Sequence, residues 1–449
     1  MILCKGTQFL SINLIEKEFI LLPDFLRNFA KKNKQYKTYK IYKTYKTYMT
    51  YTIYKTIMTQ NDEMWRWVEA NVKADPDALR LKFHGRPAGD FDTEEAVRQI
   101  ECRQRFGKKL AMTLAGNPRF FFPTALSGEQ CTSDALAAVH AAMVPEGAKM
   151  VDLTAGLGID AMHCRRRAGE ITAVERDPCV ARALAFNSDD IDVVCADCRD
   201  FVSDWEGETF DVAFIDPARR GDGGARVYGI ADCSPDVTAM LPDIRRIARR
   251  LIIKLSPMLD VASVCASLPE TACVTALGTP TECKELVVDI VFGDAPGQPQ
   301  LRALTAGVSE FCFTQAEEQA AGLALAAPAP GMWLYEPYPA VMKMQPFALL
   351  SQRFGASAIA GNTHIYICND IIADFPGTRR CIEAVVPFAS KNIKRLAAQY
   401  PRLDVAVRNF PFTAEALARK LRVRQGGDRR LIGVTDAQGQ PLMIIAAPE

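Results

Sequence analysis

The sequence predicts an α/β protein whose central part is a doubly wound sheet. Apolar runs of strand length alternate with helical stretches between residues 146 and 317, and right-handed crossovers turn that alternation into a doubly wound sheet. The first run leads into a turn with two glycines, and four successive runs each have an acidic residue at or near their carboxyl end. Because ligands bind at the carboxyl ends of such strands, we expect a binding site there.

The first expected strand, Met150–Leu153, is followed by Gly156 and Gly158 and then by a helix over Ile159–Arg167. Glycine adopts the positive φ angles that tight turns use, and its missing side chain lets a ligand approach the backbone closely. Asp152 stands four residues ahead of the first glycine. Its carboxylate either fixes the turn or meets a cationic group of the ligand.

A second strand is expected over Ile171–Val174, with Glu175 at its carboxyl end. An acidic residue about 20 residues beyond a glycine turn is the usual partner of ribose hydroxyls. The glycine turn and Glu175 together therefore predict a cofactor that contains a nucleoside.

Two kinds of nucleoside cofactor compete for this turn. Residues 156–161 satisfy G-x-G-x-x-A, the dinucleotide fingerprint, although that match alone is weak. The next two expected strands, Asp192–Cys195 and Val212–Ile215, are followed by Asp197 and Asp216. Four carboxylates suit S-adenosylmethionine, whose ammonium, ribose and adenine amine all need acceptors, whereas a pyrophosphate prefers bare backbone amides.

Nine motifs carry a resemblance to a known family. Five lie in the central part: Val-Asp-Leu-Thr-Ala-Gly-Leu-Gly-Ile-Asp (151–160), Asp-Pro-Ala-Arg-Arg-Gly (216–221), Asp-Cys-Ser-Pro-Asp-Val (232–237), Ile-Lys-Leu-Ser-Pro-Met-Leu-Asp (253–260) and Glu-Cys-Lys-Glu-Leu (282–286). Four lie downstream: Trp-Leu-Tyr-Glu-Pro-Tyr-Pro-Ala (333–340), Asn-Thr-His-Ile-Tyr (362–366), Asp-Phe-Pro-Gly (374–377) and Val-Arg-Asn-Phe-Pro (407–411).

Over roughly residues 95–449 the chain resembles the class I S-adenosylmethionine-dependent methyltransferases, and within them a bacterial group that carries a THUMP-like domain at the carboxyl end. A more distant likeness is to trimethylguanosine synthases, which share the glycine turn but have Pro-Pro-Trp where this chain has Pro-Ala-Arg. The resemblance implies a Rossmann-like methyltransferase sheet, an N-terminal helical region, and small C-terminal α/β modules that are ferredoxin-like and THUMP-like.

The resemblance also implies S-adenosyl-L-methionine as cofactor and a set of residues around it. The expected cofactor-binding residues are Asp152, Thr154, Ala155, Gly156, Gly158, Glu175, Arg176, Asp197 and Asp216. Among them the turn would wrap the methionine part, Glu175 would hold the ribose and Asp197 would meet the adenine amine. The expected catalytic residues are Asp216, Pro217 and Arg219. Methyl displacement at a sulfonium carbon needs mainly orientation, so no metal is expected.

The reaction corner departs from the pattern of amino-group methyltransferases, which commonly have Asn/Asp-Pro-Pro-aromatic there. Ala218 and Arg219 replace the second proline and the ring, so a base nitrogen remains one possible acceptor among others. Arg219, Arg220 and Arg226 either clamp a phosphate or carboxylate or are surface charges. The four histidines are scattered over the chain, and each is expected to be a surface or core residue: His84, His140, His163 and His364.

Composition bounds the class of protein. At 449 residues and 49% hydrophobic content, the chain allows two to four packed domains. Its 14 cysteines in irregular spacing fit a reducing cytoplasm, which is the expected location. No window of 18 uninterrupted apolar residues occurs, so no membrane span is expected. The oligomeric state stays undetermined by the sequence.

Residues 1–57 form a low-complexity leader in which tyrosine stands at every third position from Tyr36 to Tyr54. Such a basic aromatic tract either binds nucleic acid or is a repeat upstream of a true start at Met58 or Met64. We favour the later start, because a period of three suits neither helix nor strand packing. The leader has 11 Lys and Arg against 3 Asp and Glu, so the rest of the chain has a net charge of −7 although the total is +1.

The expected domains follow from these landmarks. A helical N-terminal domain covers 58–145, the methyltransferase domain 146–317, a ferredoxin-like module 331–386 and a THUMP-like domain 387–449. The Ala/Pro-rich stretch Ala320–Pro330 is the expected linker. The run Phe120–Phe122 is expected to pack against a neighbouring sheet rather than to stack on bases.

The expected function is S-adenosylmethionine-dependent methylation of RNA, with RNA as the partner of the C-terminal modules. Ser390–Glu449 has 11 basic against 5 acidic residues, and THUMP domains bind RNA. A small-molecule or protein methyltransferase is the first alternative, favoured by the acidic body. A noncatalytic RNA-binding protein on the same scaffold and an NAD-dependent oxidoreductase are the others.

Overall fold

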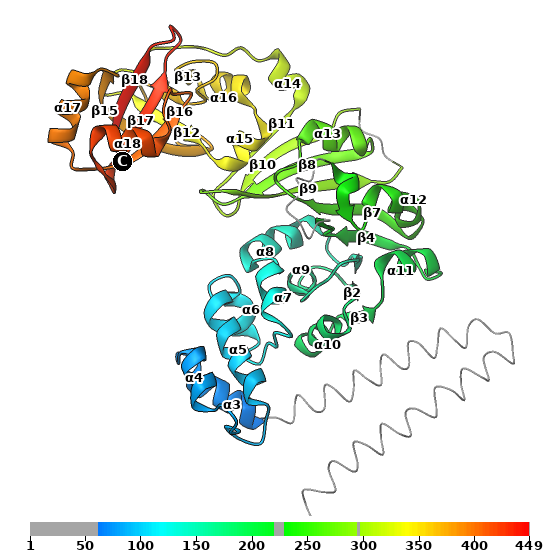
Figure 1. Ribbon diagram of the computed structural model, residues 1–449. Coiled ribbons are helices and arrows are strands. Elements are labelled where there is room, and N and C mark those ends of the chain that lie inside the picture. The colour runs from blue at the N-terminus through cyan, green and yellow to red at the C-terminus, as the bar shows by residue number, and fades with distance from the viewer. Residues whose placement is uncertain (1–61, 220–228, 294–296, 449) are drawn as a thin grey trace, which may run out of the picture. The chain divides into compact units, whose positions relative to one another are not determined.

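The computed structural model describes residues 62–219, 229–293 and 297–448 (Figure 1). The predicted leader and the basic residues Arg220 and Arg226 lie outside these residues. The described chain forms two compact units. The first unit holds the residues up to Asp134 with Ala155–Arg165 and Ile171–Cys198, and the second holds Ala135–Thr154, Arg166–Glu170 and the chain from Arg199 onward.

The first unit is mainly helical, as the N-terminal sequence predicts. Its elements are α3 (Asp62–Asn71), α4 (Pro76–Lys82), α5 (Thr93–Phe106), α6 (Ala111–Gly116), α7 (Ala125–Gln130), α9 (Ile159–Cys164), α10 (Pro178–Asn187), β2 (Glu170–Glu175) and β3 (Asp192–Cys195). Aspartates start three of these helices by accepting hydrogen bonds from the first backbone N–H groups, which otherwise lack partners: Asp75, Asp92 and Asp177. β2 and β3 pair in parallel.

The aromatic run Phe120–Phe122 is buried, but the rings that it contacts, Phe106 and Phe186, belong to the helices α5 and α10 and not to the expected sheet. Two amide side chains hold its backbone. Gln99 exchanges two hydrogen bonds with Phe122, and Asn187 exchanges two with Phe121, all between 2.7 and 3.0 Å. Because buried backbone groups need partners, these amides let the run lie extended inside the unit without a neighbouring strand.

Seven strands of the second unit lie side by side in the order β11-β10-β8-β9-β7-β4-β1. They are β1 (Lys149–Asp152), β4 (Phe210–Ile215), β7 (Ala248–Leu255), β8 (Thr271–Gly278), β9 (Cys283–Val291), β10 (Gln300–Thr305) and β11 (Ser309–Thr314). β1, β4 and β7 are parallel, whereas β9 is antiparallel to both of its neighbours. Four further helices belong to this part of the chain: α8 (Asp134–Met143), α11 (Cys198–Asp204), α12 (Val237–Ile247) and α13 (Val261–Ser267).

The predicted elements recur with small shifts in their bounds. The expected helix over Ile159–Arg167 ends at Cys164 as α9, because Arg167 turns away and its carbonyl accepts a hydrogen bond from the Gly147 backbone at 2.8 Å. Strands β10 and β11, which no motif marked, form an antiparallel pair.

The carboxyl-terminal segment forms a second sheet, in the order β13-β14-β12-β15-β18-β17-β16. Its strands are β12 (Trp333–Pro337), β13 (Ser357–Ala358), β14 (Tyr366–Cys368), β15 (Gly377–Pro387), β16 (Arg402–Arg408), β17 (Arg424–Thr435) and β18 (Pro441–Ala447). Four helices accompany it: α15 (Pro339–Met344), α16 (Phe347–Phe354), α17 (Ser390–Gln399) and α18 (Ala414–Leu421). A short helix, α14 (Gln315–Ala320), precedes it. Within this sheet only β16 and β17 pair in parallel.

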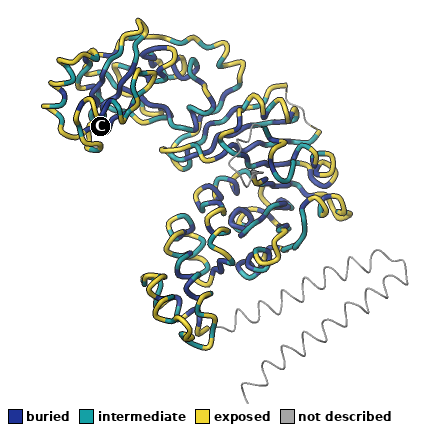
Figure 2. Tube along the Cα trace, in the orientation of Figure 1, coloured by how far each residue is buried: buried dark blue, intermediate teal, exposed yellow. Residues whose placement is uncertain are grey.

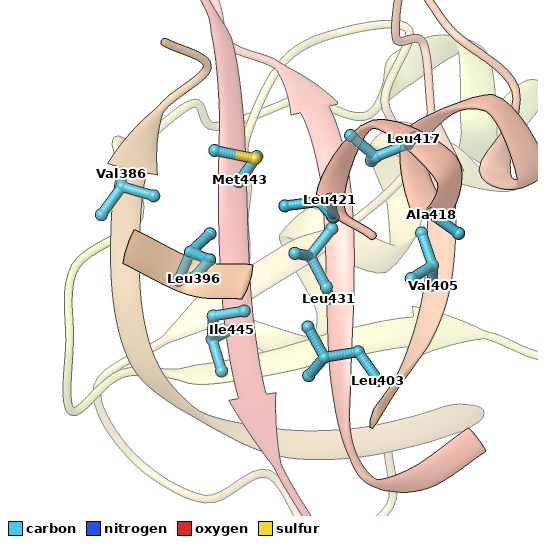
Figure 3. Packing of buried hydrophobic residues seen from close by; sticks show 10 residues of the cluster. All are labelled: Val386, Leu396, Leu403, Val405, Leu417, Ala418, Leu421, Leu431, Met443 and Ile445. Carbon is cyan, nitrogen blue, oxygen red and sulfur yellow. The ribbon is translucent and has the colours of Figure 1, made fainter. Parts of the chain in front are cut away.

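The core of the second sheet lies under α17 and α18. Leu396 of α17 and Leu417 and Leu421 of α18 pack on Leu431 and Ile445 of the strands (Figure 3). The charged residues of both helices therefore face outward. Figure 2 shows how burial varies along the chain: many strand residues are buried, and many residues of the turns are exposed.

Candidate cofactor and reaction site

The glycine turn starts from a buried carboxylate. Asp152 is the last residue of β1 and only 1% exposed, and its Oδ1 accepts a hydrogen bond from the Thr154 backbone N–H at 3.1 Å. The Leu153 N–H donates to the Phe214 carbonyl of β4 at 2.8 Å. Of the two roles that the sequence left open for Asp152, these contacts support the fixing of the turn.

The two glycines of the turn serve different purposes. Both have positive φ, +54° at Gly156 and +78° at Gly158. A side chain at Gly158 would place its Cβ 2.0 Å from Leu184 Cδ1, so this glycine is needed for the packing of α10. At Gly156 no atom lies within 4 Å of the position that a Cβ would take, so its backbone borders open space.

Glu175 holds the far side of the turn. It is the last residue of β2, and its Oε2 accepts a hydrogen bond from the Gly156 N–H at 2.9 Å. Its Oε1 accepts from the Asp177 N–H at 2.7 Å. Each carboxylate oxygen has a second lone pair, so both oxygens retain capacity for a hydroxyl donor. The next residue, Arg176, is exposed.

The remaining predicted residues lie in the turn or just beyond the ends of β3 and β4. Ala155 is buried in the turn, and Asp197 is half-buried two residues beyond β3. Asp216 follows β4 directly, and its backbone N–H donates to the Thr154 hydroxyl at 2.7 Å. Thr154 thus ties the turn to the strand end that carries Asp216. Pro217, which comes next, is buried.

The predicted arginines of the reaction corner are described only in part. Ala218 and Arg219 form β5, a two-residue strand that pairs with Cys233 and Ser234 of β6. The side chain of Arg219, like all of Arg220 and Arg226, lies outside the described part of the structure. Its predicted catalytic role therefore stays a prediction.

A row of charged side chains adjoins Asp216, and the sequence reasoning did not identify it. Lys254 of β7 donates to Asp216 Oδ2 at 2.6 Å, and its Nζ lies 3.9 Å from Oε2 of Glu285 on β9. The other Glu285 oxygen lies 2.5 Å from Nε2 of His140 on α8. One signal was available: Lys254 follows the apolar run Leu251–Ile253 in β7, and Glu285 directly precedes the apolar run Leu286–Val288 in β9.

The residues of the turn fit S-adenosylmethionine by their chemistry. The bare backbone at Gly156 leaves space for a ligand, and Glu175 supplies a carboxylate acceptor at the end of β2. In the described part of the chain no three His, Cys, Asp or Glu side chains are grouped as metal ligands. No described helix is long and apolar enough to cross a membrane.

Exposed basic side chains gather on the second sheet and its helices. Arg402 of β16 lies directly opposite Arg424 of β17, and among the described residues neither pairs with a carboxylate. Like charges at directly opposite positions of neighbouring strands repel each other. The other exposed basic residues of this basic face are Lys391, Lys394, Arg395, Arg408, Arg419, Lys420, Arg422 and Arg429.

Two family models match the carboxyl-terminal part of the chain. A ferredoxin-like domain matches residues 333–376, and a THUMP domain-like model matches residues 377–448. The strands of both segments belong to one sheet.

Solved structures identify the rest of the fold. A proposed methyltransferase from Porphyromonas gingivalis W83 matches 86% of this chain and 97% of its own chain, with a TM-score of 0.77 and 27% sequence identity. The chain has a class I methyltransferase fold followed by a THUMP-like domain. The methyltransferase fold explains why the acidic residues lie at successive strand ends. An uncharacterized protein of Methanocaldococcus jannaschii is 30% identical over 93 residues, which span 19% of this chain and about a third (32%) of that relative.

Proposed function

We propose that the protein is an S-adenosyl-L-methionine-dependent methyltransferase. The observation that carries the proposal is the Gly156 backbone, which borders open space while Glu175 holds its N–H. When bound, S-adenosylmethionine supplies a methyl group whose carbon–sulfur electron pair stays on sulfur as the acceptor's lone pair forms the new bond. Glu175 would accept ribose hydroxyls, and Asp197 the adenine amine.

The chain contributes orientation and charge to this reaction. Asp216 and the buried Pro217 would border the transferred methyl group, with Asp216 accepting a hydrogen bond from the substrate group that is methylated. Where that acceptor carries a proton, Asp216 would take up the proton as the new bond forms and pass it to water. Thr154 keeps the turn and Asp216 in register, which is the kind of positioning on which displacement reactions depend.

We further propose RNA as the substrate, delivered by the basic face of the THUMP-like domain. The opposed pair Arg402 and Arg424 supports this, because a phosphate backbone supplies the negative charge that the pair lacks. The methylated atom is unidentified, and a base within a structured RNA would have to be extruded to reach Asp216. The irregular spacing of the 14 cysteines supports a cytoplasmic location.

Nucleoside mass spectrometry on RNA from a strain that lacks the gene tests the substrate class. We expect one methylated nucleoside to disappear, the wild-type gene to restore it, and Asp216→Ala to fail to restore it. If every methylated nucleoside persists, RNA is not the substrate.

A small-molecule or protein methyltransferase is the second candidate, and the net charge of −7 over residues 58–449 favours it. An acidic body does not attract RNA by bulk charge. This candidate predicts that S-adenosylhomocysteine binds although no methylated nucleoside is lost from the deletion strain.

A further inference from the structure

The charged row beside Asp216 runs across three neighbouring strands on one face of the sheet. Asp216 follows β4, Lys254 lies in β7, and Glu285 lies in β9, two residues from Val287, the cross-strand partner of Lys254. Side chains two residues apart share a face of a strand, so Lys254 and Glu285 point to the same side. His140 on α8 closes the row from that side.

Exposure falls steadily along the row. The exposed fraction of the side chain is 39% for Asp216, 13% for Lys254, 5% for Glu285 and 0% for His140. A buried carboxylate is costly unless it is paired, so Glu285 depends on Lys254 and His140. In return Glu285, whose other oxygen is held by His140, lies 3.9 Å from the Lys254 ammonium, and the ammonium reaches the more exposed Asp216.

We propose that Lys254 is a positioning residue of the methyl-transfer site, which fixes the Asp216 carboxylate and cancels its charge beside the cofactor's sulfonium. The inference rests on the proposed function. The sulfonium loses its positive charge during transfer, so an uncompensated carboxylate would stabilise the bound cofactor more than the transition state. Lys254 removes that excess and leaves Asp216 as an oriented acceptor.

Calorimetric titration of the full chain with S-adenosylmethionine and with S-adenosylhomocysteine tests this role without any RNA. The two ligands differ in the charge on sulfur, so the ratio of their dissociation constants reports the charge of the site. Lys254→Met should shift this ratio about tenfold in favour of the charged cofactor, because Asp216 loses its compensating cation. Asp216→Asn should shift it about tenfold in the opposite direction.

Three variants control the measurement. Lys254→Arg keeps the cation and should leave the ratio near that of the wild type, as should the double variant Lys254→Met with Asp216→Asn, which removes both charges. Lys149→Met removes a lysine of β1 that pairs with Glu208 and Glu170, and should change nothing. A purely structural role of Lys254 would weaken both ligands equally and leave the ratio unchanged.

Two outcomes overturn the inference: a folded Lys254→Met protein with the wild-type ratio, or an Asp216→Asn ratio that moves toward the charged cofactor. If Lys254→Met does not fold, Lys254→Gln takes its place, with the same expected shift and the same overturning result. If the wild-type protein binds neither ligand, the proposed function fails instead, and that result is distinct from either of these.

Discussion

Two sheet edges carry charged side chains: the edge of the methyltransferase sheet at which β4 and β7 end, and the edge of the carboxyl-terminal sheet at which β16 and β17 begin. The charges at these two edges are arranged in opposite ways. At the first edge, Asp216, Lys254 and Glu285 alternate in sign and become more buried along the row. At the second, Arg402 and Arg424 have the same sign, face each other and are exposed. Matched buried charges fix geometry, whereas unmatched exposed charges attract a partner of opposite sign. The first edge is therefore suited to holding reacting groups in a fixed geometry, and the second to binding a negatively charged partner.

The largest expected effect comes from removing Asp216, the most exposed residue of the charged row that it forms with Lys254, Glu285 and His140. Asp216→Ala should lower the rate of methyl transfer about 100- to 1000-fold, the range seen when one oriented electrostatic contact is lost from an active site. Binding of S-adenosylhomocysteine should change far less, because the glycine turn and Glu175 remain. Single-turnover assays on RNA from the deletion strain measure the rate, and an Asp216→Ala rate within threefold of wild type contradicts the assignment.

Substitution of the two glycines of the turn should have different effects, mainly on stability at Gly158 and mainly on ligand binding at Gly156. Gly158→Ala should cost about 2–3 kcal/mol of stability, because the new Cβ meets Leu184 and the φ of +78° is strained for alanine. Gly156→Ala should cost about 1 kcal/mol, since only its φ of +54° opposes a side chain, but should weaken S-adenosylhomocysteine binding about tenfold. Urea unfolding and calorimetry measure the pair, and equal effects on stability would refute the distinction.

Asp134, in the first unit, is another carboxylate with several hydrogen-bond partners. Its contribution to the stability of the protein should depend on pH. Burial alone would raise the pKa of Asp134, but hydrogen bonds from the hydroxyl and N–H of Thr113, from His163 and from Met112 N–H outweigh it, so this pKa lies below its usual range. A carboxyl whose pKa is lowered by folding stabilises the protein above its unfolded pKa of about 3.9, and loses that contribution as the pH falls through the folded pKa.

Asp134→Asn should therefore lower the stability by about 2 kcal/mol at pH 7, and by progressively less below about pH 4. The urea midpoint, measured for both proteins from pH 7 to pH 3, gives this difference. A loss that is independent of pH would mean that the carboxylate charge has no part in it.

The smallest expected effect is on RNA affinity when Arg402 and Arg424 are replaced, because each arginine adds only one phosphate contact among many. Replacing Arg402 and Arg424 by Gln should reduce the slope of log affinity for RNA against log salt concentration by about two. Arg429→Gln removes a cation already paired with Glu383 and should change the slope by less than one. Filter binding over a series of salt concentrations measures the slopes. An unchanged slope in the double variant would place RNA on another surface.

The glycine turn was predictable because its signals are local. An apolar strand, two glycines and an acid 19 residues after Gly156 lie within one short stretch. The hydrogen bond that Glu175 accepts from Gly156 N–H was not predicted, and its ribose-binding role stays a prediction. The sequence did not distinguish the two glycines, because the atom that meets Gly158 belongs to Leu184 on another helix.

The charged row of Asp216, Lys254, Glu285 and His140 was not predictable, because its residues are far apart in the chain and are brought together by the order of the strands and by α8. Lys254 and Glu285 are 31 positions apart and adjoin only because β9 runs antiparallel beside β7, and His140 comes from 145 positions before Glu285. A scattered histidine is expected to be a surface or core residue, and burial alone would not reveal its carboxylate partner. The antiparallel register places Lys254 and Glu285 together, and α8 brings His140 to Glu285.

The central claim is that the glycine turn binds S-adenosylmethionine rather than a dinucleotide. Calorimetric titration of the full chain with S-adenosylhomocysteine and with NAD tests it most directly, with Glu175→Ala as the variant that removes the carboxylate from the turn. We expect S-adenosylhomocysteine to bind the wild-type protein at one site, Glu175→Ala to weaken that binding, and NAD to give no binding heat. Binding of NAD, or no binding of S-adenosylhomocysteine to the folded protein, would contradict the claim.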